Sequence, residues 1–190
     1  MRELDALKFV TSNPHKFHEA EAILREYGIK GQWIDLEYPE LQADTLKEVV
    51  LCSLKWLNKR IKGPFFIEDA GLFIHSLNGF PGPYSSYVFR TIGNEGILRL
   101  MEGVEDRKAT FKSVIGLAIE GKHYTFCGET RGFIAHSIRG TLWGFDPIFV
   151  PEEMDGLTYA ELGDRKNLVS HRRKSLELMA SWFSRKVKKA

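Results

Sequence analysis

Glu68 and Asp69 interrupt an otherwise apolar stretch of the sequence, FFIEDAGLFI at residues 65–74. A buried strand is expected to be apolar throughout, because removing a carboxylate from water costs much free energy. We therefore predict that the pair stands at the carboxyl end of a core strand, the edge at which α/β sheets bind ligands. There Asp69 and Glu40, from the turn YPELQAD, could bind Mg²⁺, which prefers one or two carboxylates together with phosphate oxygens. A salt-bridged turn without a metal explains the acidic pair about as well.

The segment TSNPHK at residues 11–16 has the groups that bind phosphate. It offers hydroxyl groups, backbone N–H groups at the start of a predicted helix, and the point charge of Lys16. It does not match the glycine-rich loops that cradle the phosphates of ATP or of dinucleotides. An ordinary helix start, with Asn13 as the N-cap and Pro14 in the first helical position, explains the segment without a ligand, and the spacing alone favours that explanation.

A third group of candidate residues lies late in the chain. Lys166, His171 and Arg172 flank the predicted start of the last helix, a place that attracts anions. Positive charge opposes the helix dipole there, which suggests that Arg172 has another role. Trp143 and Phe145 alternate around a glycine in the loop TLWGFDP, where aromatic rings could stack on a nucleobase or anchor the loop in the core.

The residues around these groups predict alternating strands and helices. Apolar alternation and periodicity indicate strands at residues 6–11, 32–38, 65–74 and 108–135, the last being two strands joined near Glu120 and Gly121. Helices are predicted at residues 15–28, 44–61 and 92–101, with a further amphipathic helix after residue 170. The segment 78–87 is rich in turn formers and is predicted to be a loop. An α/β fold with parallel and antiparallel strands in one sheet follows.

Composition sets the broad class. The chain has 190 residues, 43% of them hydrophobic, which suits one domain with a sizeable core. The formal net charge of +2 gives no general preference for nucleic acid, and the basic C-terminal residues are predicted to be solvated. Cys52 and Cys127 are predicted to be small core residues in a reducing compartment. With no signal peptide and no membrane span predicted, we expect a cytoplasmic protein without a membrane partner.

Taken in this order, the motifs resemble the inosine triphosphate pyrophosphatase family. The resemblance runs from about Lys8 to about Leu178 and rests on TSNPHK, the glutamate of YPELQAD, FIEDAGL, GFPGPYSSY, WGFDP and KNLVSHR. It implies a single domain over residues 1–190, with an elongated, two-lobed, mixed β-sheet flanked by helices. This is the ITPase-like fold, which Maf-like proteins share. A nucleotide groove between the lobes and a homodimer are also implied.

The resemblance also implies an activity and the residues that carry it. The activity is the Mg²⁺-dependent hydrolysis of ITP, dITP, XTP or dXTP to the nucleoside monophosphate and pyrophosphate, which cleans the nucleotide pool. Asp69 would be the general base and, with Glu40, would bind Mg²⁺. The residues expected to bind substrate are Thr11, Ser12, Asn13, Pro14, His15, Lys16, Ala70, Trp143, Gly144, Phe145, Asp146, Lys166, His171 and Arg172. Ala70 departs from the family, which usually has serine there.

Selectivity for the base can be explained by hydrogen bonding at position 6 of the purine. Hypoxanthine and xanthine present an acceptor oxygen at position 6, which can pair with the donors of His171 and Arg172, whereas adenine would leave those donors unpaired. Two alternatives remain open at this stage. The chain could act on modified pyrimidine or methylated purine nucleotides, or it could bind nucleotide or RNA without catalysis. Retention of both predicted metal carboxylates favours catalysis over binding alone.

Overall fold

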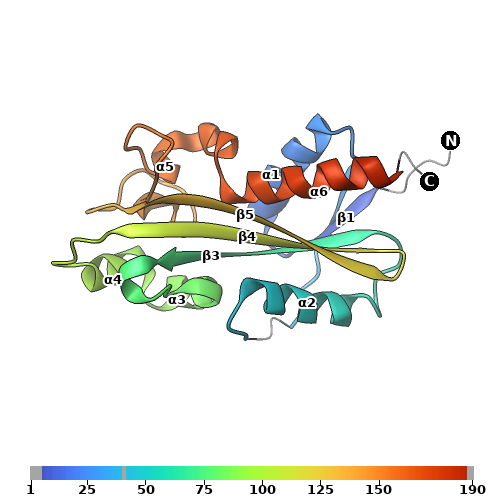
Figure 1. Cartoon of the computed structure of the whole chain (residues 1–190), viewed down its shortest axis with the longest axis horizontal. Helices are drawn as coiled ribbons and strands as arrows, with labels where there is room; N and C mark the ends of the chain where they lie inside the picture. Colours follow the sequence, from blue (N-terminus) through green and yellow to red (C-terminus); the bar gives the residue numbers. More distant parts are fainter. Residues whose placement is uncertain (1–5, 40–41, 188–190) are drawn as a thin grey trace. The chain divides into compact units, whose positions relative to one another are not determined.

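The computed structural model of the chain describes residues 6–39 and 42–187, so the predicted metal ligand Glu40 lies outside the described residues. Within those residues, six strands form one sheet in the order β2-β1-β3-β4-β5-β6 (Figure 1). The strands are β1 (Leu7–Val10), β2 (Gly31–Ile34), β3 (Phe65–Ile74), β4 (Lys108–Ile119), β5 (Lys122–Ile134) and β6 (Phe149–Pro151). β1 runs parallel to β2 and β3, whereas β5 and β6 are antiparallel. The predicted mixed sheet of an α/β fold is confirmed.

The helices of the described chain fall between and after these strands. They are α1 (Pro14–Glu26), α2 (Leu46–Leu57), α3 (Ser85–Thr91), α4 (Gly93–Leu100), α5 (Tyr159–Leu162) and α6 (His171–Val187), with short 3-10 turns that include Gly82–Tyr84 and Asp146–Ile148. The four predicted helices are present. The prediction of a loop throughout residues 78–87 is wrong at its end, because α3 begins at Ser85. α3, α5 and β6 are too short to produce a periodic pattern that sequence analysis can detect.

The chain packs as two compact units. Unit 1 holds the described residues up to Asp69, together with Ser113–Gly128 and the chain from Arg172 onward; unit 2 holds Ala70–Lys112 and Glu129–His171. Strands β3, β4 and β5 therefore each contribute residues to both units.

In unit 1, α1 and α6 lie on one face of the strands and α2 lies on the other (Figure 1). The apolar stripes of α1 and α6 pack on side chains of β1, β3 and β4, and Phe9 stacks on Phe66 with ring centroids 4.3 Å apart. A side chain in place of Gly116 on β4 would collide with Val50 and Leu54 of α2, so that glycine permits close packing of the helix. This core holds the first part of β3, directly before the acidic pair.

In unit 2, a second apolar cluster joins the later part of β3 to α3, α4, α5 and the start of β4. Within this cluster the ring centroid of Phe111 lies 5.0 Å from that of Phe149 and 5.9 Å from that of Tyr159. Within the described ranges, no helix is both long enough and apolar enough to span a membrane.

Two local predictions are wrong. The acidic pair does not end its strand: β3 continues from Phe65 to Ile74, and Glu68 is only 4% exposed in its middle. The strand tolerates the charge because cations from other elements neutralise it, as described below. Cys52 is half-buried and Cys127 is exposed, so neither is a core residue; Cys127 lies on the outward-facing side of β5.

Candidate functional site

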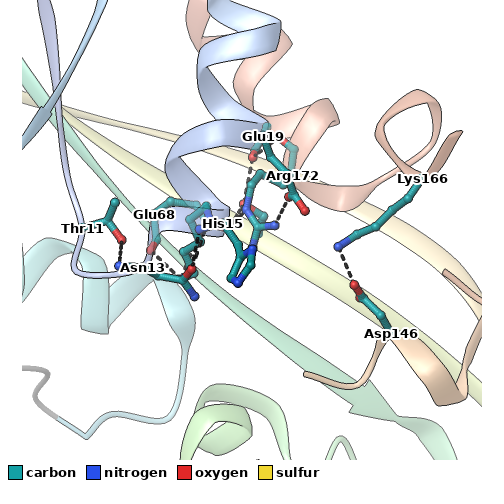
Figure 2. Close-up of polar contacts among 11 residues, drawn as sticks. Thr11, Asn13, His15, Glu19, Glu68, Asp146, Lys166 and Arg172 are labelled. Carbon is teal, nitrogen blue, oxygen red and sulfur yellow. Dashed lines mark hydrogen bonds and ion pairs between the residues drawn. The ribbon is translucent and has the colours of Figure 1, made fainter. Parts of the chain in front are cut away.

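The turn between β1 and α1 is held in one conformation by its own side chains. Asn13 Oδ1 accepts hydrogen bonds from the backbone N–H groups of His15 at 2.9 Å and Lys16 at 3.3 Å (Figure 2). The Asn13 N–H in turn donates to Thr11 Oγ1 at 3.1 Å. The predicted N-cap with Pro14 in the first turn is confirmed. The turn therefore presents a rigid helix N-terminus, the kind of backbone that attracts anions.

Trp33 of β2 supports this turn, and sequence analysis missed it. Its indole Nε1–H donates to the carbonyl oxygen of Thr11 at 2.7 Å, and its ring stacks on Phe17 with centroids 5.5 Å apart. The Thr11 N–H donates to the carbonyl of Ile34 at 3.1 Å. A tryptophan in a short edge strand was the available signal, but nothing in the sequence connects it with a turn more than twenty residues earlier.

Lys16 leaves this turn toward the acidic pair on β3. Its ammonium group lies 3.0 Å from Glu68 Oε2 and donates to the backbone carbonyl of Glu68 at 3.2 Å. Glu68 also accepts a hydrogen bond from Ser113 Oγ at 2.7 Å and lies 3.3 Å from Arg172 Nε. Burial alone would raise the pKa of the Glu68 carboxyl. The charges of Arg172 and Lys16, with the hydrogen bonds from Ser113 and Lys16, outweigh burial and hold that pKa well below its ordinary value.

Arg172 is almost fully buried, at 2% exposed, in the first turn of α6. Its guanidinium group pairs with Glu68 and with Glu19 of α1 (Figure 2). These two carboxylates explain how a cation is stable where the helix dipole disfavours it. The structure therefore gives Arg172 a second role within unit 1, and its predicted contact with a nucleobase stays a prediction. Glu19 was not recognised as a site residue from the sequence.

Two buried serines extend the network around Glu68. Ser113 Oγ lies 2.8 Å from Ser175 Oγ, and Ser175 Oγ donates to the carbonyl of Arg172 at 3.0 Å. Both serines are fully buried. A carboxylate only accepts hydrogen bonds, so the Ser113 hydroxyl donates to Glu68. Serine inside an apolar strand and on the inner face of a helix was the signal that could have identified them.

The candidate residues from Trp143 to His171 lie in unit 2. Lys166 Nζ lies 2.7 Å from Asp146 Oδ2, and both side chains are buried (Figure 2). The ammonium group of Lys166 also lies 4.9 Å from the ring centroid of Trp143 and 5.5 Å from that of Tyr159. Burial raises the pKa of the Tyr159 phenol, which keeps it neutral. A buried ion pair under aromatic rings is the type of setting that recognises a polar, flat ligand.

His171 and the loop aromatics take different positions in unit 2. The imidazole of His171 stacks on Phe111, with centroids 4.4 Å apart and planes 7° from parallel. Phe145 is buried and contacts Phe89 edge-on, so it anchors its loop in the core. Trp143 is half-buried. Of the two roles open for these aromatics, the structure gives Phe145 the core role, while a stacking role for Trp143 stays a prediction.

The remaining predicted residues lie near these groups in the sequence. Ser12, Pro14 and His15 are exposed, whereas Gly144 is half-buried and accepts a hydrogen bond at its carbonyl oxygen from Asn94 at 3.1 Å. Asp69 and Ala70 are half-buried and follow Glu68 directly on β3. The structure thus gathers Thr11–Lys16, Glu68 and Arg172 in unit 1, and Asp146, Lys166 and His171 in unit 2. The expected groove between two lobes stays a prediction.

The donor set for a metal ion is small. Among the described residues, no three side chains of His, Cys, Asp or Glu group together in a way that could hold a metal. Glu68 is committed to Lys16, Arg172 and Ser113, which makes it a poor metal ligand. The metal ligand predicted from the sequence, Asp69, follows it directly on β3 and is half-buried. One carboxylate with phosphate oxygens from a substrate is a donor set that suits Mg²⁺. The residues present therefore fit Mg²⁺ bound together with a polyphosphate.

These features define an α/β protein with a capped helix N-terminus at the end of its first strand and a buried carboxylate beside it. The chain belongs to the Ham1 family, whose sequence model matches residues 7–182.

Similar proteins agree with this family. The chain is 52% identical to a dITP/XTP pyrophosphatase of Methanopyrus kandleri, covering 94% of this chain and 96% of the relative. It is also 52% identical to a dITP/XTP pyrophosphatase of Pyrococcus horikoshii, covering 95% and 97%. Among solved structures, a HAM1 protein from Coxiella burnetii superposes with a TM-score of 0.81 at 27% identity, covering 94% of this chain and 99% of that one. The resemblance to inosine triphosphate pyrophosphatases is confirmed.

Proposed function

We propose that this protein is a nucleoside triphosphate pyrophosphatase that hydrolyses the non-canonical purine nucleotides ITP, dITP, XTP and dXTP. The products are the nucleoside monophosphate and pyrophosphate. The observation that carries the proposal is the placement of Lys16 and the capped turn beside the acidic pair of β3. It occurs in a chain that is 52% identical over nearly its full length to proteins named dITP/XTP pyrophosphatases.

The turn and Lys16 are the proposed site for the triphosphate. The backbone N–H groups at the start of α1 and the ammonium group of Lys16 would neutralise part of its charge. Lys16 is paired with Glu68. A phosphate oxygen would therefore have to share or replace that contact, so the Glu68 carboxylate keeps the ammonium group in place until a substrate arrives.

Asp69 is the proposed general base and metal ligand. It would take a proton from the attacking water at its carboxylate oxygen, while water adds across the anhydride between the α- and β-phosphates and pyrophosphate leaves. When bound, Mg²⁺ would supply charge neutralisation on the phosphates and acidify the water. Asp69 would hold this ion together with phosphate oxygens and, as the sequence predicts, with Glu40.

Recognition of the nucleoside is proposed for Trp143, Gly144, Asp146 and Lys166, with His171 and Arg172. Trp143 would stack on the base, and the buried Lys166–Asp146 pair supplies a donor and an acceptor whose relative positions are fixed. Donors facing position 6 of the base favour hypoxanthine and xanthine over adenine, because an amino group there would leave them unpaired.

We further propose a homodimer in the cytoplasm, where nucleoside triphosphates are made and used. Support for the dimer comes from large apolar side chains exposed on unit 2. They are Phe80, Tyr84, Tyr87, Phe89 and Ile92. An exposed group of this kind on one short stretch of chain is typical of a protein–protein contact.

The test is the hydrolysis of ITP, dITP, XTP, GTP and ATP with Mg²⁺, with the products identified by ion-exchange chromatography. Monophosphate plus pyrophosphate, formed from ITP and XTP at least a hundredfold faster than from ATP, is the expected result. Asp69→Asn should abolish turnover while binding of ITP persists. Release of single phosphate would refute the proposed cleavage position, and binding of ITP without turnover by the wild type would favour a non-catalytic nucleotide binder.

A further inference from the structure

Ser85, outside the proposed site, makes two hydrogen bonds through its hydroxyl group. Its hydroxyl donates to the carbonyl of Gly82 at 2.7 Å and accepts from the backbone N–H of Leu72 at 2.8 Å. Ser85 is buried, at 7% exposed. Leu72 lies on β3, three residues after Asp69. A side chain in the first turn of α3 thus accepts a hydrogen bond from a backbone N–H of the strand that carries the proposed general base.

The neighbouring backbone is packed just as closely. A Cβ atom added to Gly71 would lie 2.3 Å from the carbonyl oxygen of Gly82 and 3.2 Å from Ser85 Oγ. Such distances exclude any side chain at Gly71, because the atoms it would meet are mainly backbone. The conformation of Gly82, with φ of +56°, brings its carbonyl to this position. Gly71 therefore allows the segment before α3 to lie directly on the strand.

Further contacts continue this arrangement along β3. The Ile74 N–H donates to the carbonyl of Phe80 at 3.1 Å, and Phe73 forms an antiparallel bridge with Pro81. Residues 80–85 are therefore hydrogen-bonded to, and packed against, the part of β3 that directly follows Asp69 and Ala70. These bonds give the segment a structural role inside its own unit.

A glycine inside a strand weakens it, because glycine loses the most conformational freedom on folding and has no side chain to pack. Gly71 is two residues from Asp69, so without support the strand would bend most easily next to the carboxylate. The bond from Leu72 to Ser85 and the contact with Gly82 restrict that bending. A misplacement of about 1 Å at a reacting group can lower a rate about a hundredfold.

We propose that Ser85 is a positioning residue: its hydroxyl fixes the backbone of β3 beyond Asp69, so that the Asp69 carboxylate keeps the place needed to bind a divalent cation and to accept a proton. This inference rests on the proposed function, because it takes Asp69 as the group that acts. In this proposal Ser85 acts through the backbone of β3 and not by direct contact with substrate or metal.

The experiment compares Ser85→Ala with Ser86→Ala and Ser85→Thr. Ser86 is the neighbouring, exposed serine of the same helix, so its variant is the matched control. Ser85→Thr keeps the hydroxyl group and should restore what Ser85→Ala loses. Three experiments are carried out well below the melting temperature of each variant. They are steady-state kinetics with ITP, which gives kcat and KM, a titration that gives the Kd for Mn²⁺ in the presence of pyrophosphate, and hydrogen exchange in a peptide that covers residues 67–74. Mn²⁺ replaces Mg²⁺ because both prefer carboxylate ligands.

We expect Ser85→Ala to lower kcat about tenfold with KM changed less than twofold, to weaken Mn²⁺ binding severalfold, and to speed exchange at the Leu72 amide. Ser86→Ala should match the wild type in all three. Faster exchange in Ser85→Ala with unchanged kcat and Mn²⁺ affinity would overturn the proposal and leave Ser85 a purely structural residue. Unchanged exchange would overturn it as well.

The same experiments distinguish a failure of the proposed function from a failure of the proposal for Ser85. If the wild type hydrolyses no nucleotide, Mn²⁺ affinity and exchange still decide whether Ser85 positions Asp69. If Ser85→Thr fails to restore either of them while its melting temperature equals that of the wild type, the hydroxyl is not the group responsible, and the proposal is wrong.

Discussion

Lys16 is the residue on which the proposed phosphate site depends most. Its ammonium group is held by the side chain and the backbone of Glu68, at 3.0 Å and 3.2 Å. A charge with two fixed contacts is already oriented, so little side-chain entropy remains to be lost when a phosphate binds. In the proposed site, Glu68 would compete with phosphate for the same ammonium group, so the two residues together would set how tightly the triphosphate binds.

Replacing Lys16 by methionine should lower kcat/KM for ITP about a hundredfold, because a preorganised donor to the phosphates is lost while the apolar stem of the side chain is kept. Steady-state kinetics measures the change. Lys112→Met is a suitable control, since Lys112 makes an exposed ion pair with Glu129 and should alter kcat/KM little. An equal loss in both variants would contradict a specific role for Lys16.

The ionisation of Glu68 should make the free energy of unfolding depend on pH. Its pKa is lowered in the folded protein, so the stabilisation is fully present above the ordinary glutamate pKa of about 4.3 and is lost as the pH falls toward the lower folded value. Glu68→Gln should therefore lower the free energy of unfolding at pH 7 by about 3 kcal/mol, because it removes the buried carboxylate that Lys16 and Arg172 share, while Arg172 keeps its pair with Glu19. The difference from the wild type should shrink as the pH falls below about 4.

Urea unfolding of the metal-free protein at several pH values measures this link. Glu26→Gln is the matched control: Glu26 is a half-exposed carboxylate paired with Arg173 on the surface, and solvent screens that pair. A Glu68→Gln variant that is as stable as the wild type at pH 7 would contradict the account of the buried network.

At the scale of elements, the start of α1 has two functions that can be separated. Asn13 and Thr45 both accept N-cap hydrogen bonds, at the starts of α1 and α2 respectively. Asn13→Ala and Thr45→Ala should each cost about 1 kcal/mol of stability, seen as a small drop in melting temperature. Only Asn13→Ala should also raise KM for ITP, because only the α1 turn is proposed to bind phosphate. A similar rise in KM for both variants would assign the effect to stability alone.

The strand that carries the acidic pair illustrates how elements cooperate. β3 pairs with β1 at Phe65 and Phe66, and residues 80–85 cover it from Leu72 onward. Glu68 and Asp69 lie along the strand between these two paired stretches. The acids are tolerated inside the strand because α1 and α6 bring Lys16 and Arg172 to Glu68, a compensation that elements distant in sequence must supply.

At the scale of the whole molecule, the exposed aromatic side chains near α3 should mediate the proposed dimer. Tyr87, at 58% exposed, is the most accessible of them. Tyr87→Lys should shift the protein from dimer to monomer in analytical ultracentrifugation, because a desolvated charge opposes burial of the surface. Phe133→Lys, on the exposed side of β5, is the control. A monomeric wild type would contradict the dimer, and a dimer that persists in Tyr87→Lys would place its contact elsewhere.

The sequence by itself determined the class of fold and most of its elements. Periodicity located α1, α2, α4, α6 and the long strands, because a surface helix or strand must bury one face and so repeats its apolar residues. Asn13 and Pro14 predicted the start of α1 because capping depends on residues only a few positions apart. The motifs pointed to the family because they are short, local and ordered along the chain.

Only the tertiary structure decided which groups meet. It joined Glu68 to Arg172 and Ser113, Trp33 to Thr11, and Ser85 to Leu72. It also shows the acidic pair in the middle of β3 and not at the expected end of the strand. The physical reason is the same in each case. A buried polar group must find a partner, and in a folded chain that partner is chosen by packing between distant segments, which leaves no periodic or local trace in the sequence.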